Sequence, residues 1–301
     1  MSTDLPHKRL CVQSVIYQLP MESIERTLEY LDVAALNARN AGGIGEVVIA
    51  LGDCSPEPAL SEAHLEQLRS RFENLGEIAY HFFDANLGSA AGHNELLARS
   101  SSDFSMILNP DVLAAPNLLI EMFKPFGEAN VGFVEARQMP IEHPKSYDLE
   151  TGDTSWASTA CAVGPRHVFD EVNGFDSETF FLYGDDVDFS WRVRLQGYRV
   201  VYRPTAVIFH DKRLGQSGNW MVGAAEKYYS AEAGIYLPYK YSRPDLAEQA
   251  INYFKATNDE ALHEVVEKFE DRKKKGTLPE QLDPEHRVAE FVDGAYAKHR
   301  Y

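Results

Sequence analysis

Residues 104–112 read FSMILNPDV, an apolar run that stops at an asparagine, a proline and an aspartate. The apolar part, residues 104–108, predicts a buried strand. Pro110 favours a turn and has no backbone N–H to donate, so the strand has to end there with its polar neighbours facing outward. Because Mg²⁺ and Mn²⁺ bind one or two carboxylates together with phosphate oxygens, Asp111 is a candidate metal ligand. By itself, such a turn is more often only a turn.

Other short apolar runs lie before this strand and alternate with segments of helical length. We predict strands at residues 10–17, 46–51 and 78–83, and helices at residues 23–39 and 61–74. This alternation favours βαβ crossovers and therefore an α/β fold, a Rossmann-like, mostly parallel sheet flanked by helices. Ligands of such folds bind beyond the carboxyl ends of the strands. The candidates are therefore the polar residues that follow them: Tyr17, Gln18, residues 53–55, residues 84–88 and residues 109–111.

The composition, with 44% apolar and 25% charged residues, is that of a globular protein. A formal charge of −17 argues against nucleic acid as a partner. Three well-separated cysteines suggest neither a disulfide framework nor a cysteine-rich zinc site. No run has the roughly 20 apolar residues of a membrane span, and the first residues lack the apolar run of a secretory signal. We therefore expect a cytoplasmic location.

Residues 180–194, FFLYGDDVDFSWRVR, contain three acids within four positions, Asp185, Asp186 and Asp188. Adjacent carboxylates raise one another's proton affinity, which suits a general base. The structural alternative is a helix start, because acids in a first turn complement the helix dipole. Asp188 and Arg192 have the spacing of a helical ion pair, so we assign Asp188 to structure. Asp185 and Asp186 stay candidates for chemistry.

Two further segments carry weaker signals. His210 ends the predicted strand VVYRPTAVIFH, where it could complete a metal shell with Asp111, although a lone histidine is more often structural. Residues 86–94, NLGSAAGHN, join a strand to a helix through small residues that allow close approach of a phosphate or ribose. A tight helix entry explains Asn86 and Gly88 equally well.

In their order along the chain, these motifs resemble the family-two glycosyltransferases of the GT-A fold, particularly the bacterial rhamnosyltransferase and galactofuranosyltransferase branch. The resemblance covers about residues 10–240. It rests on the runs SVIYQ, EVVIALGDCS, NLGSAAGHN, ILNPDV, WASTACAVGPR, EVNGFD, FFLYGDDVDFSWR and LQGYRVVYRPTAVIFH.

The resemblance implies a GT-A catalytic domain at residues 1–218, with a nucleotide-sugar half at about 1–112 and an acceptor half at about 113–218. It is followed by a predicted helical extension at residues 219–301, with helices at 220–234, 244–256, 259–275 and 284–297. Aromatic residues of this extension are expected to pack on the catalytic domain.

The resemblance also implies roles for single residues. Asp111 and His210 would hold Mn²⁺ or Mg²⁺ at the donor diphosphate, with Asn109 replacing the usual first acid of this motif. Asp186 would be the base of an inverting transfer. The remaining implied contacts are Tyr17, Asp53, Asn86, Gly88 and Asn109 to the donor, and Trp156, Tyr183 and Asp185 to the acceptor.

Two departures from the family pattern affect the donor assignment. Relatives carry Asp-Asn after the second strand where this chain has Gly52 and Asp53, and Tyr-Asn after the first strand where it has Tyr17 and Gln18. Base recognition is therefore expected to shift by one residue. A nucleotidyltransferase is disfavoured because no glycine- and arginine-rich loop follows the first strand, and a noncatalytic sugar-binding or scaffold protein of the same fold stays open as an alternative.

The resemblance favours dTDP-rhamnose as donor over UDP-galactofuranose or another UDP-sugar. The expected acceptor is a glycan or lipid-linked glycan of surface polysaccharide synthesis. Residues 272–275, RKKK, could contact anionic lipid at the inner face of the membrane, although a solvated helix end explains them more simply because acidic residues lie nearby. An oligomer contact through the extension also stays open.

Overall fold

The computed structural model describes residues 7–142, 144–210 and 223–297. These residues form one eight-stranded sheet with the strand order β3-β2-β1-β4-β7-β6-β8-β5. The predicted α/β class, with a sheet flanked by helices, is confirmed. The strands are β1 (Arg9–Ile16), β2 (Glu46–Asp53), β3 (Ile78–Phe82), β4 (Phe104–Leu108), β5 (Val112–Ala114), β6 (Val131–Met139), β7 (Cys161–Pro165) and β8 (Arg199–His210).

The first half of the sheet is parallel, as the alternation of strands and helices predicts. β1 pairs in parallel with both β2 and β4, and β2 pairs in parallel with β3. Ile16 lies opposite Asp53, and Asp53 lies opposite Phe82. The carboxyl ends of these strands therefore meet at one edge, where ligands of such sheets bind.

The second half of the sheet is mixed. β7 runs antiparallel to β4 and β6, whereas β6 and β8 are parallel. The short strand β5 pairs antiparallel with β8, and Val112 lies opposite His210. This pairing carries the end of β8 back to the turn that follows β4.

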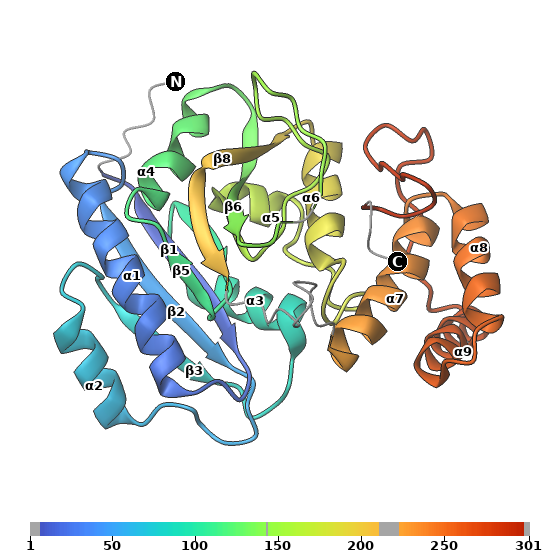
Figure 1. Ribbon diagram of the computed structural model, residues 1–301, viewed down its shortest axis with the longest axis horizontal. Coiled ribbons are helices and arrows are strands. Elements are labelled where there is room, and N and C mark those ends of the chain that lie inside the picture. Colours follow the sequence, from blue (N-terminus) through green and yellow to red (C-terminus); the bar gives the residue numbers. More distant parts are fainter. Residues whose placement is uncertain (1–6, 143, 211–222, 298–301) are drawn as a thin grey trace.

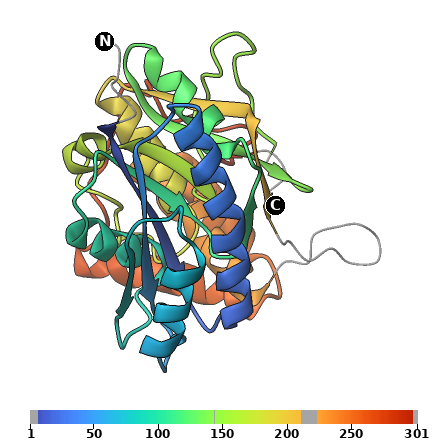
Figure 2. The same cartoon turned by 90° about the vertical axis from the view of Figure 1, so that its left-hand side faces the viewer.

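Helices cover both faces of the sheet (Figures 1 and 2). On one face lie α1 (Met21–Asn40), α2 (Glu62–Arg71) and α4 (Leu118–Phe123), which is followed by a 3₁₀ turn at Lys124–Gly127. α1 buries Ile24, Leu28 and Leu31, whose spacing forms one apolar helical face. The other face is covered by α3 (Gly88–Arg99), α5 (Arg166–Glu171) and α6 (Asp185–Leu195).

The C-terminal helices lie together at the end of the molecule opposite α1 and α2 (Figure 1). They are α7 (Ala224–Lys240), α8 (Pro244–Lys255) and α9 (Glu260–Lys275). Their apolar faces enclose Trp191 of α6 in a separate core. The predicted start of the first of these helices at residue 220 lies outside the described residues. Within those residues, no helix combines the length and the apolar composition that crossing a bilayer requires.

The helix predicted at residues 284–297 is wrong, because this segment forms turns. The carboxylate of Asp283 accepts the backbone N–H groups of Arg287, Val288 and Ala289, which holds the chain in a loop. Asp283 and His286 also have positive φ angles of 51° and 53°, which a helix cannot contain. The apolar residues that suggested a helix instead pack individually on the core of the C-terminal helices.

Candidate active site

The loops after β1 and β2 are held together at the carboxyl edge of the sheet. The hydroxyl of Ser55 accepts the backbone N–H of Gln18 at 2.8 Å. Tyr17, the residue before it, exposes 50% of its surface and can contact a ligand. The predicted donor residue Tyr17 is therefore available at this edge.

Asp53, the next predicted donor residue, is buried below this edge. Its side chain is fully buried, and its two oxygens accept the backbone N–H groups of Ser55 and Ala59 and the hydroxyl of Tyr80. Burial alone would raise the pKa of Asp53, but these hydrogen bonds outweigh it and hold the pKa below its usual value. Since the carboxylate has no exposed surface, we revise its role from donor contact to shaping the loop after β2.

The loop between β3 and α3 packs tightly against the segment that precedes α6. Gly88 has a φ of +72°, and a Cβ atom there would lie 2.4 Å from the carbonyl oxygen of Phe181. The same oxygen accepts the backbone N–H of Ser89 at 2.9 Å. Asn86 is exposed, and its side chain accepts the N–H of Gly88. Gly88 is therefore needed for this approach, while Asn86 is open to a ligand.

The Asn-Pro-Asp turn after β4 is fixed by its backbone. The N–H of Asn109 donates to Ala160 at 3.0 Å, and the carbonyl of Pro110 accepts the hydroxyl of Thr27 at 2.7 Å. Asp111 keeps 40% of its side chain exposed, and its Oδ1 lies 3.3 Å from Nε2 of His210. Asp111 and His210, which the sequence could not show to meet, are thus neighbours.

These two side chains fit a divalent cation such as Mn²⁺. One carboxylate and one imidazole are ligands that manganese accepts, and two protein ligands leave positions for phosphate oxygens. Among the described residues, no group of three or more histidine, cysteine, aspartate and glutamate side chains forms a closed metal site. The arrangement therefore suits a cation that a nucleotide helps to hold.

Asp185 and Asp186 begin α6 after a turn in which Tyr183 and Gly184 have φ angles of 62° and 76°. Asp185 is buried, and its Oδ2 has no hydrogen-bond partner among the described residues. Burial, and then the charge of Asp186, raises the pKa of Asp185 to about 7. Asp186 and Tyr183 are partly exposed. Asp186 is therefore the better placed of the two acids to contact an acceptor, and we revise the direct acceptor contact predicted for Asp185.

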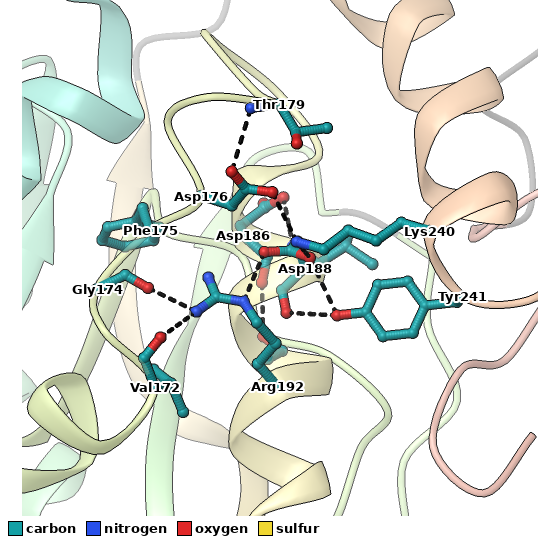
Figure 3. A network of polar contacts seen from close by, with 12 residues as sticks. Val172, Gly174, Phe175, Asp176, Thr179, Asp186, Asp188, Arg192, Lys240 and Tyr241 are labelled. Atoms are coloured by element: carbon teal, nitrogen blue, oxygen red, sulfur yellow. Dashed lines mark hydrogen bonds and ion pairs between the residues drawn. The ribbon is translucent and has the colours of Figure 1, made fainter. Parts of the chain in front are cut away.

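The third acid of this motif, Asp188, is structural, as its spacing predicts (Figure 3). Its fully buried carboxylate pairs with Arg192 at 2.8 Å and accepts the hydroxyl of Tyr241 at 3.0 Å. Lys240 bridges Asp188 and Asp176, with 2.7 Å to the latter. Lys240, the last residue of α7, and Tyr241, which follows it, thus hold Asp188 in place. Asp188 lies in the first turn of α6, two residues after Asp186.

Trp156, predicted to shape the acceptor pocket, exposes only 2% of its surface. Its ring is covered by Tyr296 and by the ammonium of Lys145, which lies 3.9 Å from the ring centroid. Lys145 also pairs with Glu135, and both side chains are buried. Trp156 therefore has little exposed surface with which to contact an acceptor.

A short segment joins the two groups of candidate residues. Ala160 accepts the N–H of Asn109, and Ala157 donates to the hydroxyl of Ser190 at 3.0 Å. That hydroxyl donates to the carbonyl of Asp186 at 2.7 Å. Because three residues span at most about 10 Å, the Asn-Pro-Asp turn and the start of α6 are held close together.

Sequence reasoning missed the buried polar residues of β6, Glu135 and Gln138. Glu135 pairs with Lys145, and Gln138 contacts both Ser158 and His210. The signal was present, because the run FVEARQM places charged and amide side chains inside an otherwise apolar strand. Because buried polar side chains normally have hydrogen-bond partners, such residues indicate polar contacts inside the protein.

Three curated proteins show what the sequence is similar to, although no family model matches it. A pre-mycofactocin glycosyltransferase of Mycobacterium tuberculosis is 29% identical over 177 residues, which cover 52% of this chain and 36% of that protein. An N-acetylglucosaminyl-diphospho-decaprenol L-rhamnosyltransferase of the same species is 32% identical over 90 residues, 30% of this chain and 26% of that protein. An O-antigen biosynthesis protein of Myxococcus xanthus is 27% identical over 42% of this chain and 9% of that protein. The chain thus matches only a minor part of each relative.

Solved structures agree in fold. A mannosyltransferase from Pyrobaculum calidifontis in complex with GDP-Man and Mn²⁺ matches with a TM-score of 0.56 and 14% identity, over 91% of this chain and 85% of that chain. GalNAc-T7 with UDP, GalNAc and Mn²⁺ matches with a TM-score of 0.61 and 12% identity, over 91% and 56%. The resemblance to the GT-A glycosyltransferases, expected from the sequence motifs, is confirmed.

Proposed function

We propose that this protein, which has the GT-A fold and whose sequence relatives are glycosyltransferases, transfers a sugar from a nucleoside diphosphate donor to an acceptor hydroxyl with inversion. The observation that carries the proposal is the hydrogen-bonded link between the two groups of candidate residues. Asn109, two residues before Asp111, is bonded to Ala160, and Ala157 is bonded through the hydroxyl of Ser190 to the backbone carbonyl of Asp186. A transfer of this kind needs a charged group at the leaving diphosphate and a base at the acceptor hydroxyl.

In the proposed reaction, the acceptor oxygen attacks the anomeric carbon while the bond from that carbon to the diphosphate breaks. Asp186, at the start of α6, accepts the hydroxyl proton as the general base. Asp111 and His210 would hold Mn²⁺ or Mg²⁺, which supplies positive charge for the departing diphosphate. Tyr17, Asn86 and Asn109 would contact the donor, and Tyr183 the acceptor.

We favour dTDP-rhamnose as the donor and a glycan or lipid-linked glycan as the acceptor, in surface polysaccharide synthesis. The rhamnosyltransferase relative, whose name specifies a diphospho-decaprenol acceptor, and the O-antigen relative support this choice. UDP-galactofuranose or another UDP-sugar is the alternative, in keeping with the neighbour solved with UDP.

Contact with the inner face of the membrane, expected from residues 272–275, gains less support from the geometry. Arg272 is used internally, since its guanidinium donates to the carbonyls of Thr277 and Glu178 and lies over the ring of Tyr236. Lys275 pairs with Asp271 at 2.7 Å. Fewer cations are thus available to anionic lipid than the sequence suggests.

Thermal unfolding with a panel of nucleoside diphosphates, each with and without Mn²⁺ or Mg²⁺, tests the proposal without an acceptor. A ligand at 100 times its dissociation constant stabilises by about 2.7 kcal/mol, which raises the midpoint by several degrees in a protein of this size. We expect dTDP or UDP to raise it only with metal. If no nucleotide does so with any metal, the noncatalytic alternative replaces the transferase.

Two variants sharpen this test. Asp111→Ala should abolish the metal-dependent shift. Asp103→Asn provides the matched control, because Asp103 stands at the opposite end of β4, where it contacts Lys8 and the N–H of Arg9. It should keep the shift.

A further inference from the structure

The ring of His210 is held from both sides. Its Nε2 faces Asp111, as described above, and its Nδ1 lies 3.1 Å from Oε1 of Gln138. Gln138 belongs to β6, exposes 2% of its surface, and donates from Nε2 to the hydroxyl of Ser158 at 3.1 Å. In this arrangement its amide oxygen is left to accept, so Nδ1 of His210 has to carry the hydrogen.

This assignment has a consequence on the other side of the ring. A neutral imidazole with its hydrogen on Nδ1 presents a lone pair at Nε2, and that lone pair faces a carboxylate oxygen of Asp111 at 3.3 Å. Two acceptors at this distance repel one another unless a positive charge lies with them. A divalent cation bound by both atoms removes the repulsion, and it requires the tautomer that Gln138 selects.

We propose that Gln138 is a positioning residue that fixes the tautomer and the ring orientation of His210, so that Nε2 is the nitrogen that coordinates the cation with Asp111. The inference rests on the proposed metal role of Asp111 and His210. Outer contacts of this kind orient metal ligands in proteins generally, and their removal costs about 10- to 100-fold in metal affinity.

Gln138 is itself held in place by its partner. Ser158 is 5% exposed, and its hydroxyl also accepts the N–H of Ala160 at 3.4 Å. Its backbone N–H donates to the carboxylate of Glu135. The orientation of the Gln138 amide is therefore set by residues 157–160, the segment that is also bonded to α6. The side chain of Gln138 thus loses little conformational freedom when the cation binds.

The tautomer of His210 can be measured without metal or substrate. We expect ¹⁵N chemical shifts of the imidazole, recorded in metal-free protein at alkaline pH and assigned with a His210→Gln variant, to show hydrogen on Nδ1. Gln138→Leu should shift the population toward hydrogen on Nε2. Hydrogen on Nε2 in the wild type, or the same tautomer in both proteins, would overturn the inference.

Metal affinity provides the second readout, as Mn²⁺ binding in the presence of saturating nucleoside diphosphate. Gln138→Leu should weaken binding about 10- to 100-fold, whereas Gln138→Glu, which keeps an acceptor at Nδ1, should stay close to wild type. Gln13→Leu is the matched control, because Gln13 is a fully buried glutamine of β1 whose side chain has no hydrogen-bond partner among the described residues. It should leave the affinity unchanged.

The binding experiments distinguish a failure of the proposed metal role from a failure of the proposed role of Gln138. If the wild type binds no Mn²⁺ with nucleotide, the proposed metal role fails. If it binds Mn²⁺ and Asp111→Ala abolishes binding, while Gln138→Leu and Gln138→Glu both bind like the wild type, only the role of Gln138 fails. If Gln138→Leu does not fold, Ser158→Ala takes its place and should weaken binding in the same direction, and unchanged binding in that variant would also refute the inference.

Discussion

Glu135 and Lys145 form an ion pair in which the two side chains expose only 3% and 4% of their surfaces. Lys145 also donates to the carbonyl of Trp156 at 3.1 Å, so the pair holds the chain next to Ala157, which is bonded to Ser190 of α6. Burial raises the pKa of Glu135 to about 7, although the charge of Lys145 acts in the opposite direction. The charge of Lys145 thus stabilises the ionised form of Glu135.

Replacing Lys145 by Met should therefore lower the free energy of unfolding most at alkaline pH, by up to about 3–5 kcal/mol, because an ionised carboxylate then stays buried without its partner. The double variant Glu135→Gln/Lys145→Met should recover most of the loss. Urea unfolding at alkaline pH measures both. Arg99→Met breaks an exposed pair with Glu95, in which each side chain is 47% exposed, and should cost less than about 1 kcal/mol. A Lys145→Met loss no larger than this control would contradict the prediction.

The raised pKa of Asp185 predicts a pH dependence of stability. Burial and the charge of Asp186 raise this pKa from 3.8 to about 7, so the folded state binds the proton more tightly than the unfolded state. The resulting stabilisation is complete below the pKa that Asp185 has in the unfolded chain. It is lost as the pH rises through about 7, the pKa of Asp185 in the folded protein. Asp185→Asn should remove this loss and gain stability relative to wild type between pH 5 and pH 8.

Unfolding by urea at these two pH values measures the effect. Asp148→Asn is the control, because hydrogen bonds with Thr151 lower the pKa of Asp148 instead. The stabilisation from Asp148 is present above the pKa that this carboxyl has in the unfolded chain, so it is complete at both pH values. A difference between Asp185→Asn and wild type that does not change with pH would show that Asp185 is ionised throughout.

Asp186→Asn should lower kcat by about 10²- to 10⁴-fold, because general base catalysis contributes that much to a proton transfer. The dissociation constant of the nucleoside diphosphate with Mn²⁺ should not change, since the donor lies on the other side of the reacting carbon. Initial rates with a sugar acceptor and a separate nucleotide titration test the two statements. Near-normal turnover would assign the base to another residue.

Gly88→Ala should impair both stability and activity. The left-handed conformation costs a non-glycine residue about 1–2 kcal/mol, and the new methyl group would also meet the carbonyl of Phe181. We expect a lower unfolding midpoint and a lower kcat/KM, because the start of α3 would move away from the segment before α6. Gly127→Ala should change neither the unfolding midpoint nor kcat/KM, because a Cβ atom added at Gly127 would have no neighbouring atom within 4 Å. Equal effects in the two variants would contradict this account.

The parallel half of the sheet could be predicted from sequence because each of its strands is a short apolar run followed by a turn. β6 and β7 were not assigned, since Glu135 and Gln138 interrupt the apolar pattern of β6 and antiparallel pairing depends on distant partners. The contact between Asp111 and His210 likewise depends on β5 pairing with β8, which no local pattern encodes.

For the candidate site, the sequence indicates segments more readily than the exposure of single side chains. Asp53, Trp156 and Asp185 all lie in the expected segments, yet they are buried. Chain position cannot distinguish an aspartate that faces solvent from one that accepts two backbone N–H groups, as Asp53 does. That distinction follows from the turn geometry, which the tertiary structure sets.

The contacts of Asp188 with Lys240 and Tyr241 also limit how the protein can be redesigned. A chimaera that joins residues 1–218 to the C-terminal helices of a relative would leave the Asp188 carboxylate without its two partners from this chain. The exchanged segment would therefore have to include α6 together with the C-terminal helices. In a chimaera, the start of α6 and the end of α7 have to come from the same parent protein, and the candidate base lies in this shared segment.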